Sequence, residues 1–193
     1  MTSDPRPARR DGPRCHLRQP QYRDESELRA LRRASWAELE PWEPTREPDE
    51  DPCSAKWFRN YLGRSRSPSN ATYLLVRNAD NVLLGHLGLG VITRGALQSA
   101  YAGYWVGTPF RRQGWMTQGL GLLLEVAFVD LGLHRLEANI RPENEPSLKL
   151  AARVGFQREG YSPKYLHIDG AWCDHERWAV LSEDWLATRD AGS

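Results

Sequence analysis

Hydrophobic residues change their spacing about a third of the way along the chain. In the segments 24–39 and 54–62, leucines and aromatic residues recur at helical spacing, which predicts two amphipathic helices. The stretch Glu40–Pro52 between them is rich in proline and in acidic residues. Proline at that density disfavours a helix or an inner strand, so this stretch is predicted to be an exposed acidic loop.

From residue 72 onward, short apolar runs separated by Gly, Asn and Asp predict β-strands. The predicted strands are 72–77, 82–93, 97–106, 134–140, 156–168 and 172–181. Short connections predict that the first three form an antiparallel meander and the last two a hairpin. Helical spacing occupies the segment between Gly114 and Gly132, and again 145–154. This order of elements predicts an α+β protein with a mixed sheet.

The chain has 193 residues, which suits one domain with a proper core. Residues 1–13 are rich in proline and arginine and lack apolar residues that could pack, so they are predicted to be disordered. Residues 14–187 are predicted to form the domain, and 188–193 a flexible tail.

Composition and charge exclude several classes of protein. The formal net charge is +1, so no overall field favours nucleic acid or an anionic membrane. Cys15, Cys53 and Cys173 are widely spaced, which predicts neither a zinc site nor a disulfide framework. An odd number of cysteines without an apolar leader is typical of a reducing cytoplasm. We therefore expect a cytoplasmic protein with no metal, no direct contact with nucleic acid and no membrane contact.

The segment Arg111–Thr117 joins the end of a predicted strand to the start of a predicted helix. Free N–H groups and the helix dipole make such a junction a binding site for an anion such as a pyrophosphate. Gly114 allows the backbone to approach a phosphate closely, and Arg111 and Arg112 add charge for a further phosphate. A basic loop without a ligand is the alternative, because short glycine motifs are common.

A second motif surrounds the start of the predicted helix 145–154. Asn144 stands just before this helix, Pro146 can open it and Ser147 lies in its first turn. Helix capping alone explains each of these residues singly. It does not explain why they follow a phosphate-binding turn by about 30 residues.

Together these motifs resemble those of the GNAT superfamily of N-acetyltransferases. The Q/R-x-x-G-x-G/A turn of that superfamily matches Arg111, Gly114 and Met116, and its later N-x-x-S and Gly-Phe motifs match Asn144, Ser147, Gly155 and Phe156. More narrowly, the chain resembles the RimJ-type alanine N-acetyltransferases, which acetylate the N terminus of a ribosomal protein. This resemblance covers residues 14–185 and includes the segments 39–44, 103–106, 134–135, 158–161 and 168–175.

The resemblance implies the GNAT fold, a mixed central sheet of about seven strands flanked by about four helices. It also implies acetyl-CoA as cosubstrate and direct attack of an amine on the thioester within a ternary complex. A backbone N–H group in the strand would hold the charge that develops on the carbonyl oxygen. The implied cofactor-binding residues are Tyr104, Trp105, Val106, Arg111, Arg112, Gln113, Gly114, Trp115, Met116, Thr117, Asn139, Asn144 and Ser147.

The resemblance also implies catalytic residues. By family position, Ser147 is the donor of a proton to the departing CoA thiolate. Many relatives carry an acid two residues before the Gly-Tyr pair, where this chain has Tyr101, so the base remains open. Glu43 and Glu40 are candidate loop acids that would receive the proton through water, and Tyr101 would either orient such a water or serve as a buried aromatic. Trp42, Glu40 and Glu43 are predicted to contact the substrate.

Two further departures concern the turn, where Arg112 replaces a usual glycine and Met116 a usual small residue. Arg112 either stiffens the loop or adds a phosphate contact. Three histidines, His134, His167 and His175, lie in strand-like segments among aromatic residues, and we expect structural roles for them.

Three functions remain open from the sequence. The first is transfer of acetyl to the N-terminal α-amino group, Ala or Ser, of a protein, with a ribosomal protein as partner. The acidic stretch Glu40–Asp51 would attract the basic N terminus of such a protein. The second is acetylation of a small amine such as an aminoglycoside or a polyamine, and the third is a GNAT module that binds acyl-CoA without turnover. Either a monomer or a dimer is compatible with the sequence.

Overall fold

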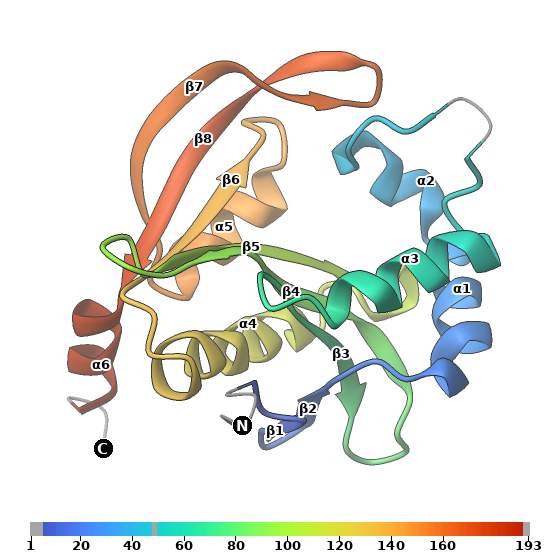
Figure 1. Cartoon of the computed structure of the whole chain (residues 1–193), viewed down its shortest axis with the longest axis horizontal. Coiled ribbons are helices and arrows are strands. Elements are labelled where there is room, and N and C mark those ends of the chain that lie inside the picture. The colour runs from blue at the N-terminus through green and yellow to red at the C-terminus, as the bar shows by residue number, and fades with distance from the viewer. Residues whose placement is uncertain (1–5, 48–49, 191–193) are drawn as a thin grey trace.

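The computed structural model describes residues 6–47 and 50–190. They form one mixed sheet of eight strands in the order β1-β2-β3-β4-β5-β6-β8-β7 (Figure 1). All neighbouring strands are antiparallel except β5 and β6, which are parallel. The strands are β1 (Arg9–Asp11), β2 (Cys15–Arg18), β3 (Ala71–Arg77), β4 (Leu83–Thr93), β5 (Ser99–Val106), β6 (Arg135–Ile140), β7 (Gln157–Ile168) and β8 (Ala171–Leu181).

The described part of the chain also contains six α-helices and several short helical turns. The α-helices are α1 (Glu25–Ala34), α2 (Trp36–Leu39), α3 (Ala55–Ser65), α4 (Trp115–Glu125), α5 (Glu145–Arg153) and α6 (Ser182–Asp190). The short turns are the 3-10 helices η1 (Tyr22–Asp24), η2 (Glu40–Trp42) and η3 (Thr108–Phe110) and the π-helical turn η4 (Val126–Asp130). None of the described helices is both long and apolar enough to cross a membrane.

The α+β class and the predicted strands and helices are confirmed, with ends that differ by a few residues. The expected counts of strands and helices were low, because β1, β2 and α6 were missed and the predicted helix 24–39 is divided into α1 and α2. Strand β1 lies within the segment 1–13, so the prediction of disorder is wrong for Arg9–Asp11. This strand has no apolar core of its own; it pairs with β2, and its Arg10 forms an ion pair with Asp130.

Helix α6 extends to Asp190 and so includes the first residues of the predicted tail 188–193. Its Trp185 packs against Phe128, with ring centroids 5.5 Å apart, which holds the helix on the domain. Residues 1–5, 48–49 and 191–193 lie outside the described part of the chain.

The acidic stretch is more ordered than the sequence predicts, because it begins with η2 and is tied down by Arg32. Pro41 lies in the first turn of η2, where a missing N–H group has no cost. Arg32 makes two hydrogen bonds to Glu43, of 3.1 and 2.9 Å, and a third of 3.0 Å to Pro52 O. Its guanidinium also lies over three indole rings, those of Trp36, Trp57 and Trp105. With 3% of its side chain exposed, Arg32 is a buried cation whose donors are used.

Helices cover both faces of the sheet. On β3, the adjacent residues Leu74 and Leu75 point to opposite faces, and each joins a different buried cluster. The cluster with Leu75 includes α4, which packs against β2, β4 and β5, and Ala151 of α5. The cluster with Leu74 includes residues of α1 and α3. The β7–β8 hairpin extends beyond both layers, and its far end lies beside the acidic stretch (Figure 1), where Pro44 bridges to Ile168.

The sheet opens in its middle. Strands β5 and β6 pair only at Ser99–Tyr101 with Arg135–Glu137. Beyond this point β5 continues along β4 to Val106, while β6 continues along β8 to Ile140. The two strands therefore part, and their facing edges line a gap that opens beside α4 and α5.

Arg32 offers a direct test of what holds the acidic stretch in place. We expect Arg32→Ala to lower the free energy of unfolding by about 2–4 kcal/mol, because the Glu43 carboxylate and a carbonyl lose a buried partner. Urea denaturation followed by tryptophan fluorescence measures this. Arg33→Ala is the matched control on the same helix, since the ion pair of Arg33 with Asp51 is more than half exposed and contributes about 1 kcal/mol or less. Equal losses in the two variants would contradict the assignment.

Candidate active site

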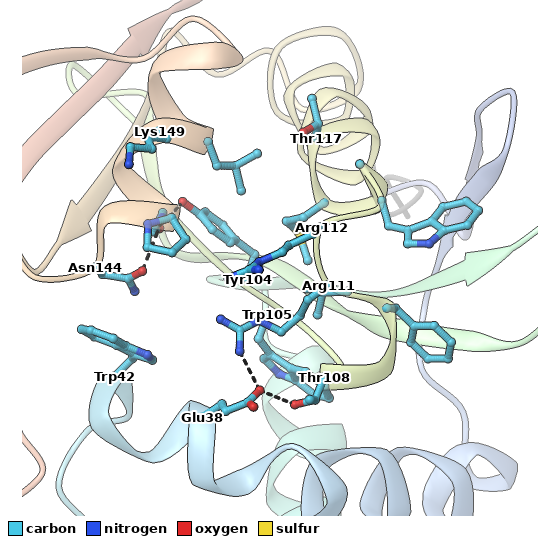
Figure 2. A pocket seen from close by; sticks show the side chains of 18 of the residues that line it. Glu38, Trp42, Tyr104, Trp105, Thr108, Arg111, Arg112, Thr117, Asn144 and Lys149 are labelled. Atoms are coloured by element: carbon cyan, nitrogen blue, oxygen red, sulfur yellow. Dashed lines mark hydrogen bonds and ion pairs between the residues drawn. The ribbon is translucent and has the colours of Figure 1, made fainter.

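A cleft of about 380 Å³ lies where β5, α4 and α5 meet. Figure 2 shows Arg111 and Arg112 on the turn before α4, with Asn144 and Lys149 on the α5 side of the cleft. The lining residues are Glu38, Leu39, Trp42, Tyr104, Trp105, Val106, Thr108, Phe110, Arg111, Arg112, Gly114, Trp115, Met116, Thr117, Asn144, Pro146, Ser147, Lys149, Leu150 and Arg153. Eleven of the thirteen predicted cofactor-binding residues are among them.

The turn before α4 has the backbone geometry of an anion site. Gly114 is the N-cap of α4 at a φ of 80°, a left-handed conformation that glycine adopts without strain. No side chain caps the helix, so the N–H groups of its first turn are left to a ligand or to water. Arg112 is also left-handed, at a φ of 60°, and it stands at the position where the GNAT turn usually has glycine. The site therefore fits a phosphate or a pyrophosphate at the helix N-terminus.

The basic side chains around the cleft differ in their freedom to bind an anion. Arg111 Nη1 lies 2.7 Å from Glu38 Oε2, which also accepts a hydrogen bond from Thr108 Oγ1. These two donors, Thr108 first, lower the pKa of Glu38, so its carboxylate stays ionised and compensates Arg111. Arg112 has no such partner among the described residues, and on this basis it is the freer of the two arginines.

Two cations of the cleft, Lys149 and Arg153 of α5, were not among the residues predicted from the sequence. Lys149 is paired with Glu145 at 2.8 Å, in a largely exposed ion pair. The two cations are four residues apart, so they share one face of the helix, and they follow Asn144 by about one and two turns. This spacing was the available signal in the sequence.

Ser147 and Tyr104 form the polar centre of the cleft. Their hydroxyl oxygens lie 2.7 Å apart, joining α5 to β5. The helix cap is made by Asn144 instead, whose Oδ1 accepts from Ser147 N at 3.2 Å. The Ser147 hydroxyl is therefore not used for capping. Burial raises the pKa of Tyr104, which keeps its hydroxyl protonated at neutral pH.

Backbone N–H groups also point into the gap between the parted strands. Gly107 N donates to Leu84 O. The pairing of β5 with β4 continues without a shift from Val106 back to Tyr101. Alternate residues of an antiparallel strand direct their N–H groups to the same neighbour. The N–H groups of Tyr104 and Val106 therefore point away from β4, toward the side that β6 has left.

A smaller cavity of about 180 Å³ occupies the gap itself. Residues 102–104 of β5 and 138–140 of β6 line it, as do Arg141 and His175. It shares Trp42, Tyr104, Asn144 and Ser147 with the larger cleft, so the two spaces meet at the Tyr104–Ser147 pair. Asn139, predicted to contact the cofactor, lines this smaller cavity and not the larger cleft.

Gln113 also lies outside the lining of the cleft. Its Nε2 donates to Pro109 O and its Oε1 accepts from Trp115 Nε1, both at 3.0 Å, so it fixes the shape of the turn. Trp42, predicted to contact the substrate, lines both spaces. Arg141 lies 5.4 Å from its ring and donates to Pro41 O, which holds η2 in place.

The other predicted polar residues are not brought into the cleft. Glu40 and Glu43 line a separate groove of about 250 Å³ beside the hairpin turn. Both oxygens of Glu43 accept from Arg32, and Glu40 pairs with Arg46 at 3.3 Å. Tyr101 is three residues from Tyr104, so it faces the other side of the sheet. There, burial and then the Glu137 carboxylate raise its pKa.

Metal ligation has no candidate in the described residues: no group of three or more His, Cys, Asp or Glu side chains is close enough to hold an ion.

Residues 14–157 match the family described as an acetyltransferase (GNAT) domain. "Probable N-acetyltransferase YjcK" of Bacillus subtilis (strain 168) is 39% identical over 129 residues, 67% of this chain and 71% of that protein. The ribosomal protein uS5-alanine N-acetyltransferase of Escherichia coli (strain K12) is 33% identical over 155 residues, 78% of this chain and 79% of that protein. The structure of Mycobacterium smegmatis RimJ in complex with CoA-disulfide has 34% identity and a TM-score of 0.81, covering 88% of this chain and 83% of that one.

These similarities confirm the resemblance on which the expected fold rested, and GNAT acetyltransferases use acetyl-CoA. The turn before α4, the parted strands and the Tyr104–Ser147 pair lie within the matched region. The chain belongs to the GNAT acetyltransferase family, close to the RimJ ribosomal-protein N-acetyltransferases.

Proposed function

We propose that this protein transfers acetyl from acetyl-CoA to the N-terminal α-amino group of a protein that begins with Ala or Ser, and that a ribosomal protein is its substrate. The observation that carries the proposal is the meeting of the two spaces at Ser147 and Tyr104. A cosubstrate in the larger cleft and an amine in the gap would meet there. The similarity to uS5-alanine and RimJ acetyltransferases favours a protein N terminus as the acceptor.

The residues of the larger cleft fit acetyl-CoA, which supplies the thioester carbonyl that the amine attacks. The first-turn N–H groups of α4 would hold the pyrophosphate, and Arg112, Lys149 and Arg153 would add charge for the phosphates. The N–H groups of Tyr104 and Val106 would bond the pantetheine arm and the carbonyl oxygen as it gains charge.

Ser147 would donate the proton that the leaving sulfur needs. The thiolate of CoA has a pKa close to that of a cysteine, so protonation assists its departure. The Ser147 hydroxyl is suited to this step because Tyr104, 2.7 Å away, can donate to it in turn. We assign no proton transfer to Glu43 or Tyr101, since the first is held by Arg32 and the second faces the other side of the sheet.

An α-amino group needs less help from the protein to lose its proton than a lysine side chain does. Its pKa is near 8, against about 10.4 for a lysine side chain, so a larger fraction is neutral at physiological pH. The groove beside the hairpin turn supports a basic peptide beyond the N terminus, because Glu40, Glu43, Glu47 and Asp169 line it with Arg46 as its single lining cation in the described chain. Much of the charge of the acidic stretch is compensated by arginines, so steering by this stretch is weaker than its sequence suggests.

A peptide panel tests the proposed function. We expect purified protein and acetyl-CoA to release CoA thiol with basic peptides that begin with Ala or Ser, and far less with a lysine peptide whose N terminus is blocked. Ser147→Ala should lower kcat about 100-fold and leave acetyl-CoA binding unchanged. Ser69→Ala, at an exposed serine, is the matched control. Turnover confined to polyamines or aminoglycosides would move the assignment to small amines, and binding without thiol release from any acceptor would indicate a non-catalytic module.

Binding of acetyl-CoA tests the cation assignment separately. Arg112→Gly and Lys149→Gln should each weaken the Kd for acetyl-CoA about tenfold, because each removes one charge-assisted hydrogen bond. Glycine suits the left-handed conformation at position 112, so Arg112→Gly should not lower the stability of the fold. Arg59→Gln, at an exposed position of α3, is the control, and calorimetry is the measurement. A Kd that stays unchanged in both variants would exclude these residues from phosphate binding.

A further inference from the structure

The smaller cavity contains a buried histidine that the proposed mechanism has not used. His175 of β8 is 3% exposed and lines the cavity together with Asn139, Tyr104 and Ser147. The register that pairs β6 with β8 places His175 on the side of the sheet that Asn139 faces. Ser147 and the core of the larger cleft lie on the side of α4 and α5. The cavity therefore has a hydroxyl pair at one end and an imidazole at the other.

The hydrogen bonding of His175 determines which ring nitrogen can act. Nδ1 lies 3.0 Å from the carbonyl oxygen of Cys173. A carbonyl only accepts, so Nδ1 carries the hydrogen and Nε2 of the neutral ring is an acceptor. No side chain or backbone group in the described part of the chain forms a hydrogen bond with Nε2.

The surroundings of His175 keep it neutral. Burial lowers the pKa of His175, and the Arg141 guanidinium lowers it further. The carbonyl of Cys173 and the carboxylates of Glu143 and Asp174 act in the opposite direction. Asp174 is occupied by Tyr161 Oη and by Lys164 N.

Two more neighbours complete the environment of the imidazole. The ring of Tyr165 on β7 makes an edge contact with it, with centroids 5.9 Å apart, and adds no charge. Asn139 lines the same cavity, and its buried Oδ1 has no hydrogen-bond partner in the described chain. Among the lining residues, an amine in this cavity would thus meet the uncharged acceptor Nε2 of His175 and no carboxylate, with Arg141 as the lining cation.

We propose that His175 is the general base of the acetyl transfer, with Nε2 accepting the proton that the attacking amine releases. The proposal rests on the proposed acetyl transfer and adds to it the group that the sequence left open. As the C–N bond forms and the C–S bond breaks, one proton passes from nitrogen to His175 and one from Ser147 to sulfur. His175 then returns its proton to solvent and Ser147 regains one, so the products are the N-acetyl peptide and free CoA thiol.

The pH dependence of kcat/KM with an Ala-starting peptide distinguishes a base from a structural histidine. Both the amine and His175 must be neutral, so the rate falls as pH falls. We expect the slope of log(kcat/KM) against pH in the wild type to rise from about 1 below the pKa of the amine to about 2 below that of His175.

Two substitutions of His175 separate its functions. His175→Asn keeps a donor where Nδ1 bonds Cys173 O and removes Nε2. His175→Gln instead places an amide near the position of Nε2, and this amide can accept a hydrogen bond but cannot take up a proton. Both should lower kcat about 100-fold, with a slope of about 1 throughout the acid range and an unchanged Kd for acetyl-CoA. His134→Asn is the control, since His134 pairs with Glu183 at the far end of β6 and should leave the profile as in the wild type.

The outcomes are distinguishable. Wild-type turnover of the peptide with unaltered kcat and slope in both His175 variants would overturn the proposal for His175 and leave the acetyl transfer intact. Absence of wild-type turnover with any peptide would overturn the proposed function itself.

If the variants do not fold, nitrogen NMR of the wild type with labelled histidine still decides. We expect the Nδ1–H tautomer of His175 at pH 7 and a shift of its Nε2 signal when an Ala-starting peptide is added. An imidazolium at pH 7, or a proton on Nε2 of the neutral ring, would contradict the proposal.

Discussion

The separation of β5 from β6 is the constraint on which the rest of the site depends. The two strands pair over only three residues, after which each follows its other neighbour. In an ordinary sheet the N–H groups of Tyr104 and Val106 would be satisfied by the next strand, and here they face open space instead. The same separation creates the smaller cavity and lets it meet the larger cleft at Ser147. One break in strand pairing therefore frees the backbone N–H groups, forms the smaller cavity and lets that cavity reach the Tyr104–Ser147 pair.

The cover of this gap is held in place by two arginines, Arg32, which is buried, and Arg141, which is partly exposed. Arg32 fixes the start of the acidic stretch through Glu43 and Pro52 O, and Arg141 binds η2 through Pro41 O and the ring of Trp42. Because a guanidinium has five donors in one plane, each of these arginines can bind several groups from different segments at once. A further link comes from the hairpin, since Thr45 Oγ1 accepts from Gly170 N at 2.8 Å. A proline-rich stretch that begins with the short 3-10 helix η2 thereby becomes one wall of the site.

Charge at the site is arranged with more compensation than the sequence suggests. Arg111 is paired with Glu38 and Glu43 with Arg32, so neither residue presents its full charge to a ligand. Arg112 on the turn and Arg153 of α5 have no carboxylate partner among the described residues, and on the acceptor side His175 offers a neutral acceptor near Arg141. A cation site for phosphates and a site without carboxylates for an amine thus lie on opposite sides of one gap. This division suits a reaction in which an anionic cosubstrate must meet a neutral nucleophile.

The sequence by itself determined the α+β class, most strands and helices, and the turn that begins α4, because these depend on local periodicity, on glycine and proline, and on residues close together in the chain. It also identified Asn144 and Ser147, which a short motif contains. It missed β1 and β2, which are short: β1 is held by pairing with β2 and by the ion pair of Arg10 with Asp130, and β2 by pairing with β3 and by Cys15 and Leu17 in the core. Only the tertiary structure decided which acids are free, which face Tyr101 occupies, and that His175 lies across a cavity from Ser147. Those properties depend on contacts between residues far apart in the chain, for which local spacing carries no signal.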